Sequence, residues 1–481
     1  MMGSLDQYLN SYKLAFRTEI DFVVQFTSYF CEHIKELDRA DASVFSTVFE
    51  ASIERLISPQ LAGRSENVEE IIVAFSEVAH YIHFHKEYPI SGERISKVIE
   101  HYCDYFDNKY LTPARFLEIA VESGIMKATA DGFQYKFANR NHLAYFVAKA
   151  LNRKYHDDND ETNLRIVLEQ SCFGINADIL SFLTYISDNV RIPRLMLSQA
   201  LACAEDWAEF DLTGKDIKYL KAIPAQPVKP PAVNQREAEL EQRSEKEEIA
   251  VRNNDILESL DIYDYDPSKI DEIANQLLRS FLQLQIISRN FSAFMSILPA
   301  RDRKAYVSAM YQLPNKIFYR WAKYVDENLE PLLDELLAWQ EDESYRGRRY
   351  SRDRLRDEIQ KLSTNQLLNL YYIVAVYGTN NATAEYIASQ EYIADSLNYR
   401  VQRLLVYEKV DNVQPAVKEA EDIFRGNEDG MVRNLISAFF NHLLINSDRI
   451  SASERRRIAK KYFSTEGQTR VLLGRRKVSK L

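Results

Sequence analysis

The chain has 481 residues, of which 46% are apolar and 27% charged, and its formal net charge is −10. This negative charge excludes nucleic-acid binding that is driven by bulk charge. Only 13 glycines and 13 prolines occur, too few for the tight turns of a sandwich, a barrel or a large α/β sheet. Most segments consist of good helix formers. We therefore predict a mostly α-helical chain with roughly two to four domain cores.

The distribution of charged residues and cysteines indicates where in the cell the protein is expected. Charged residues interrupt the first 25 positions, which excludes a signal peptide. No apolar run approaches the ~20 residues that span a bilayer. The four cysteines form no CxxC pair, as expected for free thiols in a reducing compartment. We expect a cytoplasmic protein without a membrane partner.

Residues 1–84 are expected to form an N-terminal helical domain. One amphipathic stripe runs from Phe22 to Phe30, and a second runs from Phe45 to Leu56. Both repeat apolar residues at intervals of three and four, the spacing of a helix with one buried face. A third helix is predicted from Glu69 to Phe84.

Residues 85–154 have the element order of a winged helix. Ser91 is a candidate N-cap for one helix, and Thr112-Pro113 opens a second helix that Gly124 ends. Two short alternating runs, 125–129 and 133–137, follow on either side of Asp131-Gly132, a strong hairpin signal. This hairpin is the one place where we predict β structure, and a helix over 142–154 follows it.

The rest of the chain divides at a polar segment. We predict a helical segment over 155–222 and a linker over 223–262, which is rich in proline, then in Glu, Gln, Lys and Arg. Residues 263–481 are predicted to form a C-terminal helical domain with a basic loop and a basic tail. No fixed internal repeat is present.

Residues 135–151 carry a family resemblance, in the string Tyr-Lys-Phe-Ala-Asn-Arg-Asn-His-Leu-Ala-Tyr-Phe-Val-Ala-Lys-Ala-Leu. Together with the preceding hairpin, this string resembles the winged-helix module that follows the nucleotide-binding core in bacterial STAND-type (NACHT-like) signalling NTPases. The Phe182-Leu183-Thr184-Tyr185 segment and the Pro-containing linker also resemble that family. The likeness extends from about residue 20 to about residue 340, and its most specific part is 135–151.

The resemblance implies the regulatory and sensor half of a nucleotide switch used in antiphage defence or signal response. The winged helix would pack on an NTPase or effector domain or subunit, and the C-terminal array would bind a trigger protein or nucleic acid, in a chain able to form homo-oligomers. Asn139 matches the position of a nucleotide-sensing residue that is often histidine in the family. Arg140 beside it is a candidate phosphate ligand, although an N-cap region for the next helix is the favoured interpretation. The apolar face of that helix is predicted to pack between domains through Leu143, Phe146, Val147 and Leu151.

No catalytic residue is predicted in this chain. A phosphate-binding loop needs the pattern GxxxxGK[ST], and none of the glycines stands in it. A nucleophile elbow is also missing. ATP or ADP and Mg²⁺ would belong to an NTPase core supplied elsewhere. His80 and His83 have metal-like spacing, but helix packing explains them, and we predict no metal site.

Two alternatives remain open. The first is a helical scaffold that binds nucleic acid through the basic segments 345–356 and 454–480, where arginine alternates with tyrosine or clusters in the tail. The second is a plain helical adaptor. The first alternative uses these residues: Tyr345, Arg346, Arg348, Arg349, Tyr350, Arg352, Arg354, Arg475, Arg476 and Lys477.

Overall fold

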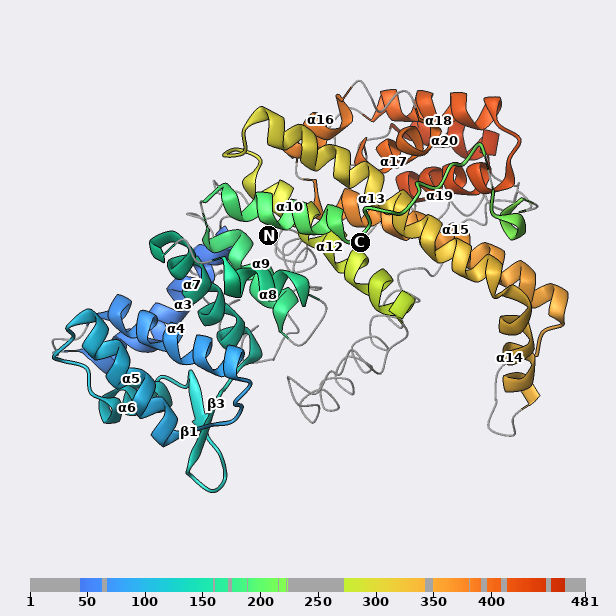
Figure 1. Ribbon diagram of the computed structural model, residues 1–481. Helices are drawn as coiled ribbons and strands as arrows, with labels where there is room; N and C mark the ends of the chain where they lie inside the picture. The colour runs from blue at the N-terminus through green and yellow to red at the C-terminus, as the bar shows by residue number, and fades with distance from the viewer. Residues whose placement is uncertain are drawn as a thin grey trace, which may run out of the picture. The chain divides into compact units, whose positions relative to one another are not determined.

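The computed structural model describes most of the chain as two compact units (Figure 1). The described residues are 44–62, 67–158, 161–171, 175–187, 189–214, 216–221, 223, 272–341, 349–379, 381–390, 396–407, 413–446 and 451–462. Of these, 44–199 and 272–299 belong to unit 1, and the remainder belong to unit 2. The predicted linker lies outside the described residues except for Ile223, as do residues 1–43.

Unit 1 is helical apart from one small sheet. Its elements are α3 (Val44–Ile57), η1 (Ser58–Leu61), α4 (Val68–His85), β1 (Ile90–Ser91), α5 (Gly92–Phe106), α6 (Pro113–Glu122), β2 (Met126–Ala128), β3 (Gln134–Phe137), α7 (Arg140–Asp158), α8 (Thr162–Glu169), α9 (Asn176–Ile186), α10 (Arg191–Ala202) and α12 (Glu272–Phe294). The fold-class prediction, mostly helical with one short β-hairpin, is confirmed.

The sheet has the strand order β1-β3-β2, and both pairings are antiparallel. Ile90 pairs with Tyr135, and Met126 pairs with Phe137. The sequence predicted the β2–β3 hairpin but not β1, whose two residues are too short to show an alternating pattern. The order α4, β1, α5, α6, β2, β3 is that of a winged helix, in which α6 is the third helix and directly precedes the hairpin.

Local sequence signals explain where these elements begin and end. Ser91 Oγ accepts a hydrogen bond from Arg94 N at 3.3 Å, and Thr112 Oγ1 accepts one from Arg115 N at 3.2 Å. Both side chains therefore cap the helices that the sequence predicted. Gly124 has φ +71° after α6, and Gly132 has φ +73° in the hairpin turn. Both angles lie in the left-handed region that only glycine adopts freely.

α7 is the central helix of unit 1 and packs against α4 and α9 (Figure 1). Its residues from Leu143 to Ala148 are all fully buried. Phe146 stacks on Phe75 of α4 with ring centroids 5.0 Å apart. α12 packs against α9 and contributes Ile286 to the same core. The winged-helix elements and the helices after α7 therefore share one continuous core.

Unit 2 is an array of helices. Its elements are η2 (Lys218–Leu220), α13 (Ala300–Glu327), α14 (Leu329–Glu341), α15 (Arg352–Tyr377), α16 (Asn381–Ala388), α17 (Leu397–Tyr407), α18 (Gln414–Gly426), α19 (Gly430–Asn446) and α20 (Ala452–Tyr462). The long helices α13 and α15 pack together, and α17 contacts both. α15 begins at Arg352 and is capped by Ser351. The second half of the predicted basic loop, 345–356, is therefore helical.

A buried polar cluster holds the segment before η2 against these helices. Asn398 Nδ2 of α17 donates to Phe210 O and to Asn315 Oδ1, both at 2.8 Å. The hydroxyl of Tyr371 on α15 donates to the same Asn315 oxygen at 2.7 Å. Since buried amide groups are costly unless they are hydrogen-bonded, this cluster fixes the positions of the four segments relative to one another.

None of the helices in the described residues is long and apolar enough to span a bilayer.

Candidate functional site

The outer face of α6 decides what the winged helix can bind, because this helix enters the DNA groove in nucleic-acid readers. Here it exposes Ala114, Glu118, Val121 and Glu122. Its single basic residue, Arg115, is 9% exposed, pairs with Glu118 at 2.7 Å and donates to Gln60 O at 2.6 Å. The exposed face of α6 therefore presents two carboxylates, which the phosphates of a nucleic acid would repel, and two apolar side chains.

The hairpin and the end of α5 expose large aromatic side chains. Phe133 at the hairpin is 78% exposed, and Tyr105 and Tyr110 are 70% and 66% exposed. The hairpin also carries two exposed lysines, Lys127 and Lys136, directly opposite one another. Aromatic residues are enriched in protein–protein interfaces, and each ring buries a large area there.

The candidate nucleotide-sensing pair, Asn139 and Arg140, is occupied by contacts within unit 1. Asn139 is 5% exposed, and its Oδ1 accepts from Asn141 N at 2.6 Å, so Asn139 caps α7. Arg140 Nε donates to Asp178 Oδ2 of α9 at 2.8 Å. This arrangement is the one expected of an N-cap region, and it anchors the start of α7 to α9.

The four residues predicted for interdomain packing all lie in the core of unit 1. Leu143, Phe146 and Val147 are fully buried, and Leu151 is 3% exposed. Phe146 contacts Phe75 and also Phe137 of β3, with ring centroids 5.8 Å apart in the second pair. Phe146 therefore joins α7 to α4 and to the sheet.

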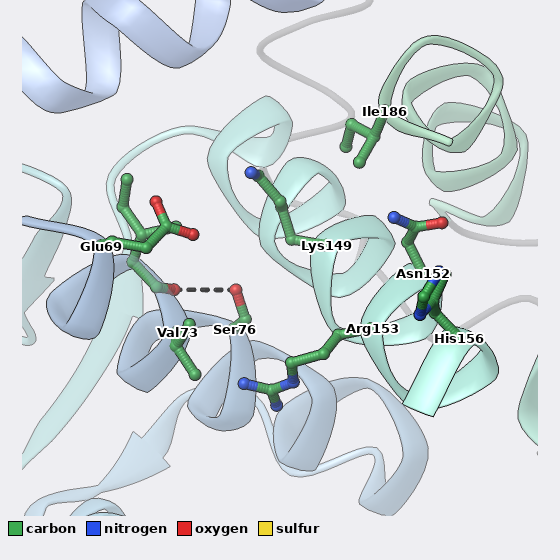
Figure 2. Close-up of a pocket in the computed structure, with 9 residues that line it drawn as sticks. Glu69, Val73, Ser76, Lys149, Asn152, Arg153, His156 and Ile186 are labelled. Carbon is green, nitrogen blue, oxygen red and sulfur yellow. Dashed lines mark hydrogen bonds between the residues drawn. The ribbon is translucent and has the colours of Figure 1, made fainter. Parts of the chain in front are cut away.

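A cavity of about 300 Å³ lies between α4 and α7 (Figure 2). Figure 2 shows that α7 supplies Lys149, Asn152, Arg153 and His156, that α4 supplies Glu69, Val73 and Ser76, and that Ile186 comes from the end of α9. The lining residues are Glu69, Ile72, Val73, Ser76, Lys149, Asn152, Arg153, His156 and Ile186. Lys149, Arg153 and His156 are spaced four and three residues apart, so they form one stripe along α7.

The two cations of this stripe each have one carboxylate partner. Lys149 pairs with Glu50 of α3, and Arg153 pairs with Glu77 of α4, which also pairs with Lys154 at 3.3 Å. Arg153 lies over the Phe106 ring, with 5.4 Å from its guanidinium carbon to the ring centroid. Its Nη1 is buried and has no hydrogen-bond partner among the described residues. No local pattern in the sequence predicts this cavity, although the spacing of the basic residues of α7 can be read from it.

The described part of the candidate nucleic-acid segment is engaged in ion pairs. Arg352 pairs with Glu330 at 2.6 Å and with Asp334, and Arg354 pairs with Glu358 at 2.7 Å. Hydrogen bonds from Arg352 and Arg356 hold the pKa of Glu330 below its usual value. Phosphate contact by these arginines would therefore compete with carboxylates that are already in place.

The other candidate nucleic-acid residues that the structure describes lie just before α15 and in α20. Arg349 is exposed, and Tyr350 is half-buried with its backbone N–H donating to Gln340 Oε1 at 2.5 Å. In α20, Arg457 and Lys461 both pair with Glu421, at 2.6 and 3.2 Å. The remaining candidates lie outside the described residues: Tyr345, Arg346, Arg348, Arg475, Arg476 and Lys477.

The histidines of α4 are used in packing. His80 Nε2 lies 3.1 Å from Asn163 Nδ2, and His80 packs on Phe84 with ring centroids 4.7 Å apart. Burial, with a smaller contribution from His80, lowers the pKa of His83 to about 4. No group of three or more potential metal ligands comes together in the part of the chain that the structure describes.

The chain matches no protein-family model, no curated protein and no solved structure.

Proposed function

We propose that this chain is the regulatory and sensor portion of a STAND-type NTPase switch, and that its winged helix binds protein. The outer face of α6 carries the second part of this proposal, since Glu118, Val121 and Glu122 are exposed and its only arginine is buried. An acidic and apolar surface suits a protein partner and disfavours a duplex. The resemblance of residues 135–151 supports the STAND part.

In this proposal the chain itself performs no catalysis. An NTPase core on another region or chain would hold ATP or ADP with Mg²⁺, and the winged helix would pack against it and hold the off state. The helical array of unit 2 would bind the trigger. A trigger can shift the equilibrium between the off and on states only if it binds the on state more tightly than the off state. Bacterial antiphage defence or signal response in the cytoplasm is the corresponding biological role.

The first test is to read the DNA immediately upstream of the Met1 codon and in the adjacent genes. A P-loop coding region in frame, or in a neighbouring gene, would supply the partner that the proposal needs. The two proteins would then be co-expressed, and the ATPase rate of the partner measured with and without this chain. We expect this chain to lower that rate. The lack of a P-loop reading frame, or an unchanged rate with the purified partner, would contradict the switch.

A pair of charge reversals tests the role of α6. Glu122→Lys reverses a charge on the exposed face of α6, and Glu100→Lys makes the same reversal at an exposed position of α5. We expect Glu122→Lys to relieve the inhibition of the partner and Glu100→Lys to leave it intact. If both variants inhibit as the wild type does, α6 is not the contact surface.

Nucleic-acid binding is the competing outcome. Wild-type protein is titrated into labelled duplex and single-stranded DNA and RNA between low and physiological salt. We expect no binding that falls steeply with salt, the mark of phosphate contacts. A steep dependence that survives without any NTPase would instead favour the scaffold that uses 345–356 and 454–480.

A further inference from the structure

We propose that α13, α15 and α17 of unit 2 form a receptor for an extended peptide, that residues 204–220 of the chain occupy it, and that a segment of a partner protein with the pattern Phe-x-Leu replaces them. The proposed function enters only in identifying that partner with the trigger. We call the occupying segment the strap, and the structure describes it at 204–214 and 216–220.

The strap has little regular structure of its own. It consists of turns and extended backbone up to the short 3-10 helix η2, and it belongs to the same compact unit as the three helices. In Figure 1 it runs as a green extended trace across the helices of unit 2. Because no helix or strand pairs most of its backbone N–H and C=O groups, the buried ones need partners from elsewhere.

Asn398 of α17 supplies two of these partners from one side chain. Its Oδ1 accepts from Leu212 N at 3.0 Å, and its Nδ2 donates to Phe210 O at 2.8 Å. The same Nδ2 also donates to Asn315 Oδ1 at 2.8 Å, which holds the amide in this orientation. Both bonds to the strap go to backbone groups, so an extended peptide of a different sequence can make them as well.

The two ends of the strap are held in the same way. Near its start, Lys316 Nζ of α13 donates to two consecutive carbonyls, those of 204–205, at 3.0 and 3.2 Å. Near its end, Asp326 of α13 accepts from Tyr219 N at 3.0 Å, and Gln360 of α15 donates to Tyr219 O at 2.7 Å. Side chains of helices thus bind the strap through its backbone at three places.

Alternate side chains of the strap enter the array. Phe210 and Leu212 are each 2% exposed, whereas Asp211 between them is exposed. The ring of Phe210 meets Phe318 of α13 edge-on, with ring centroids 4.7 Å apart. Backbone hydrogen bonds with buried positions for alternate side chains are the way extended peptides are recognised on protein surfaces. The array therefore selects an aromatic and an aliphatic residue two positions apart.

The test is fluorescence anisotropy of a labelled peptide with the sequence of residues 204–220, titrated with the full chain. The double variant Phe210→Ala, Leu212→Ala removes the two buried anchors of the strap, so its site should open to the peptide. We expect it to bind the peptide at least about tenfold more tightly than the wild type, in which the tethered strap competes at a high effective concentration.

The control for this substitution is Phe133→Ala on the exposed hairpin of unit 1, which should bind the peptide as weakly as the wild type does. Thermal melts verify that the double variant is folded. Equal affinities of the double variant and the wild type, or no saturable binding to the folded double variant, would overturn the proposal.

Two further comparisons locate the bound peptide. A peptide that itself carries Phe210→Ala and Leu212→Ala should not bind the double variant. In the background of the double variant, Lys316→Met should weaken peptide binding about threefold or more, because hydrogen bonds from an ammonium are lost. Lys323→Met removes an exposed lysine of the same helix and should change nothing. An unchanged affinity with Lys316→Met, or tight binding of the alanine peptide, would contradict binding in place of the strap.

Hydrogen exchange of the wild type tests the strap without any variant, and it decides the question if the double variant does not fold. The amides of Leu212 and Tyr219 should exchange faster than the amides in the middle of α13 and α15, because the strap leaves without unfolding the array. Excess peptide should speed their exchange further. Exchange of the strap at the rate of α13 and α15 would show a fixed part of the core and overturn the proposal. No NTPase takes part in these measurements, so their failure leaves the proposed switch standing.

Discussion

Gln402 of α17 donates its Nε2 hydrogen to the backbone carbonyl of Met310 in α13, at 2.8 Å. Pro314 lies four residues after Met310 in the same helix and has no N–H to give that carbonyl. A buried backbone carbonyl without a hydrogen-bond partner destabilises the fold, and both Met310 and Gln402 are fully buried. The side chain of α17 therefore completes the hydrogen-bonding of α13 at its proline.

Replacing Gln402 tests this relationship. Gln402→Met keeps most of the side-chain volume but leaves Met310 O unbonded, and we expect a loss of about 1–3 kcal/mol in the free energy of unfolding. The measurement is urea unfolding followed by helical circular dichroism. A midpoint equal to that of the wild type would show that the hydrogen bond does not matter for stability.

A double-mutant cycle separates this hydrogen bond from packing. Pro314→Ala returns an N–H that can bond Met310 O within the helix. In that background Gln402→Met should cost less than it does in the wild type, because the carbonyl keeps a partner. Equal costs in the two backgrounds would assign the effect to packing alone.

The sequence predicted the elements whose signals are local. Ser91 and Thr112 cap the expected helices, and Gly124 and Gly132 stand where left-handed backbone is needed. These signals depend on a few neighbouring residues, so they can be read without a fold. The hairpin was found for the same reason, whereas β1 was missed because it exists only through its pairing with β3.

The candidate site depended on contacts between distant segments, and these were harder to predict. Arg140 was visible as a cation, but its partner Asp178 is 38 residues away. The cavity combines α4 with α7, and nothing in either segment indicates that Arg153 Nη1 is left without a partner. Arg352 and Arg356 belong to a basic run in the sequence, yet Glu330 and Asp334 of α14 pair with them.

Phe146 offers a direct test of the core of unit 1. The ring is fully buried between Phe75 and Phe137, so Phe146→Ala should cost about 3–5 kcal/mol. The matched control is Phe133→Ala on the exposed hairpin, which should change stability by less than about 0.5 kcal/mol. Scanning calorimetry of both variants checks the pair. An unchanged melting curve for Phe146→Ala would refute the placement of this ring.

Two buried histidines make stability depend on pH. Burial lowers the pKa of His83 and of His142 to about 4, assisted by His80 in the first case and Lys127 in the second. The unfolded chain, with histidine pKa values near 6.5, binds more protons between these values. Stability is therefore complete above about pH 6.5 and falls as pH drops toward 4, by up to about 3 kcal/mol per histidine.

The measurement is the free energy of unfolding in urea between pH 7.5 and 5.5, where carboxylates stay ionised. We expect little change above about pH 6.5 and a growing loss below it, and His142→Gln should reduce that loss because it removes one of the two titrations. Exposed His101 provides the control, since His101→Gln should leave the slope as it is. A wild-type stability that is constant over this range would show that neither histidine is held neutral by burial.

Gly132 tests whether the hairpin turn requires glycine for its backbone alone. Its φ is +73°, and an added Cβ would meet no atom within 4 Å, so the cost of Gly132→Ala comes from the backbone conformation and not from a clash. We expect a loss of about 1 kcal/mol. Gly132→Asn should cost less, since asparagine tolerates the left-handed region better than alanine does. Thermal melts rank the three proteins, and alanine as stable as glycine would mean that the turn rearranges without cost.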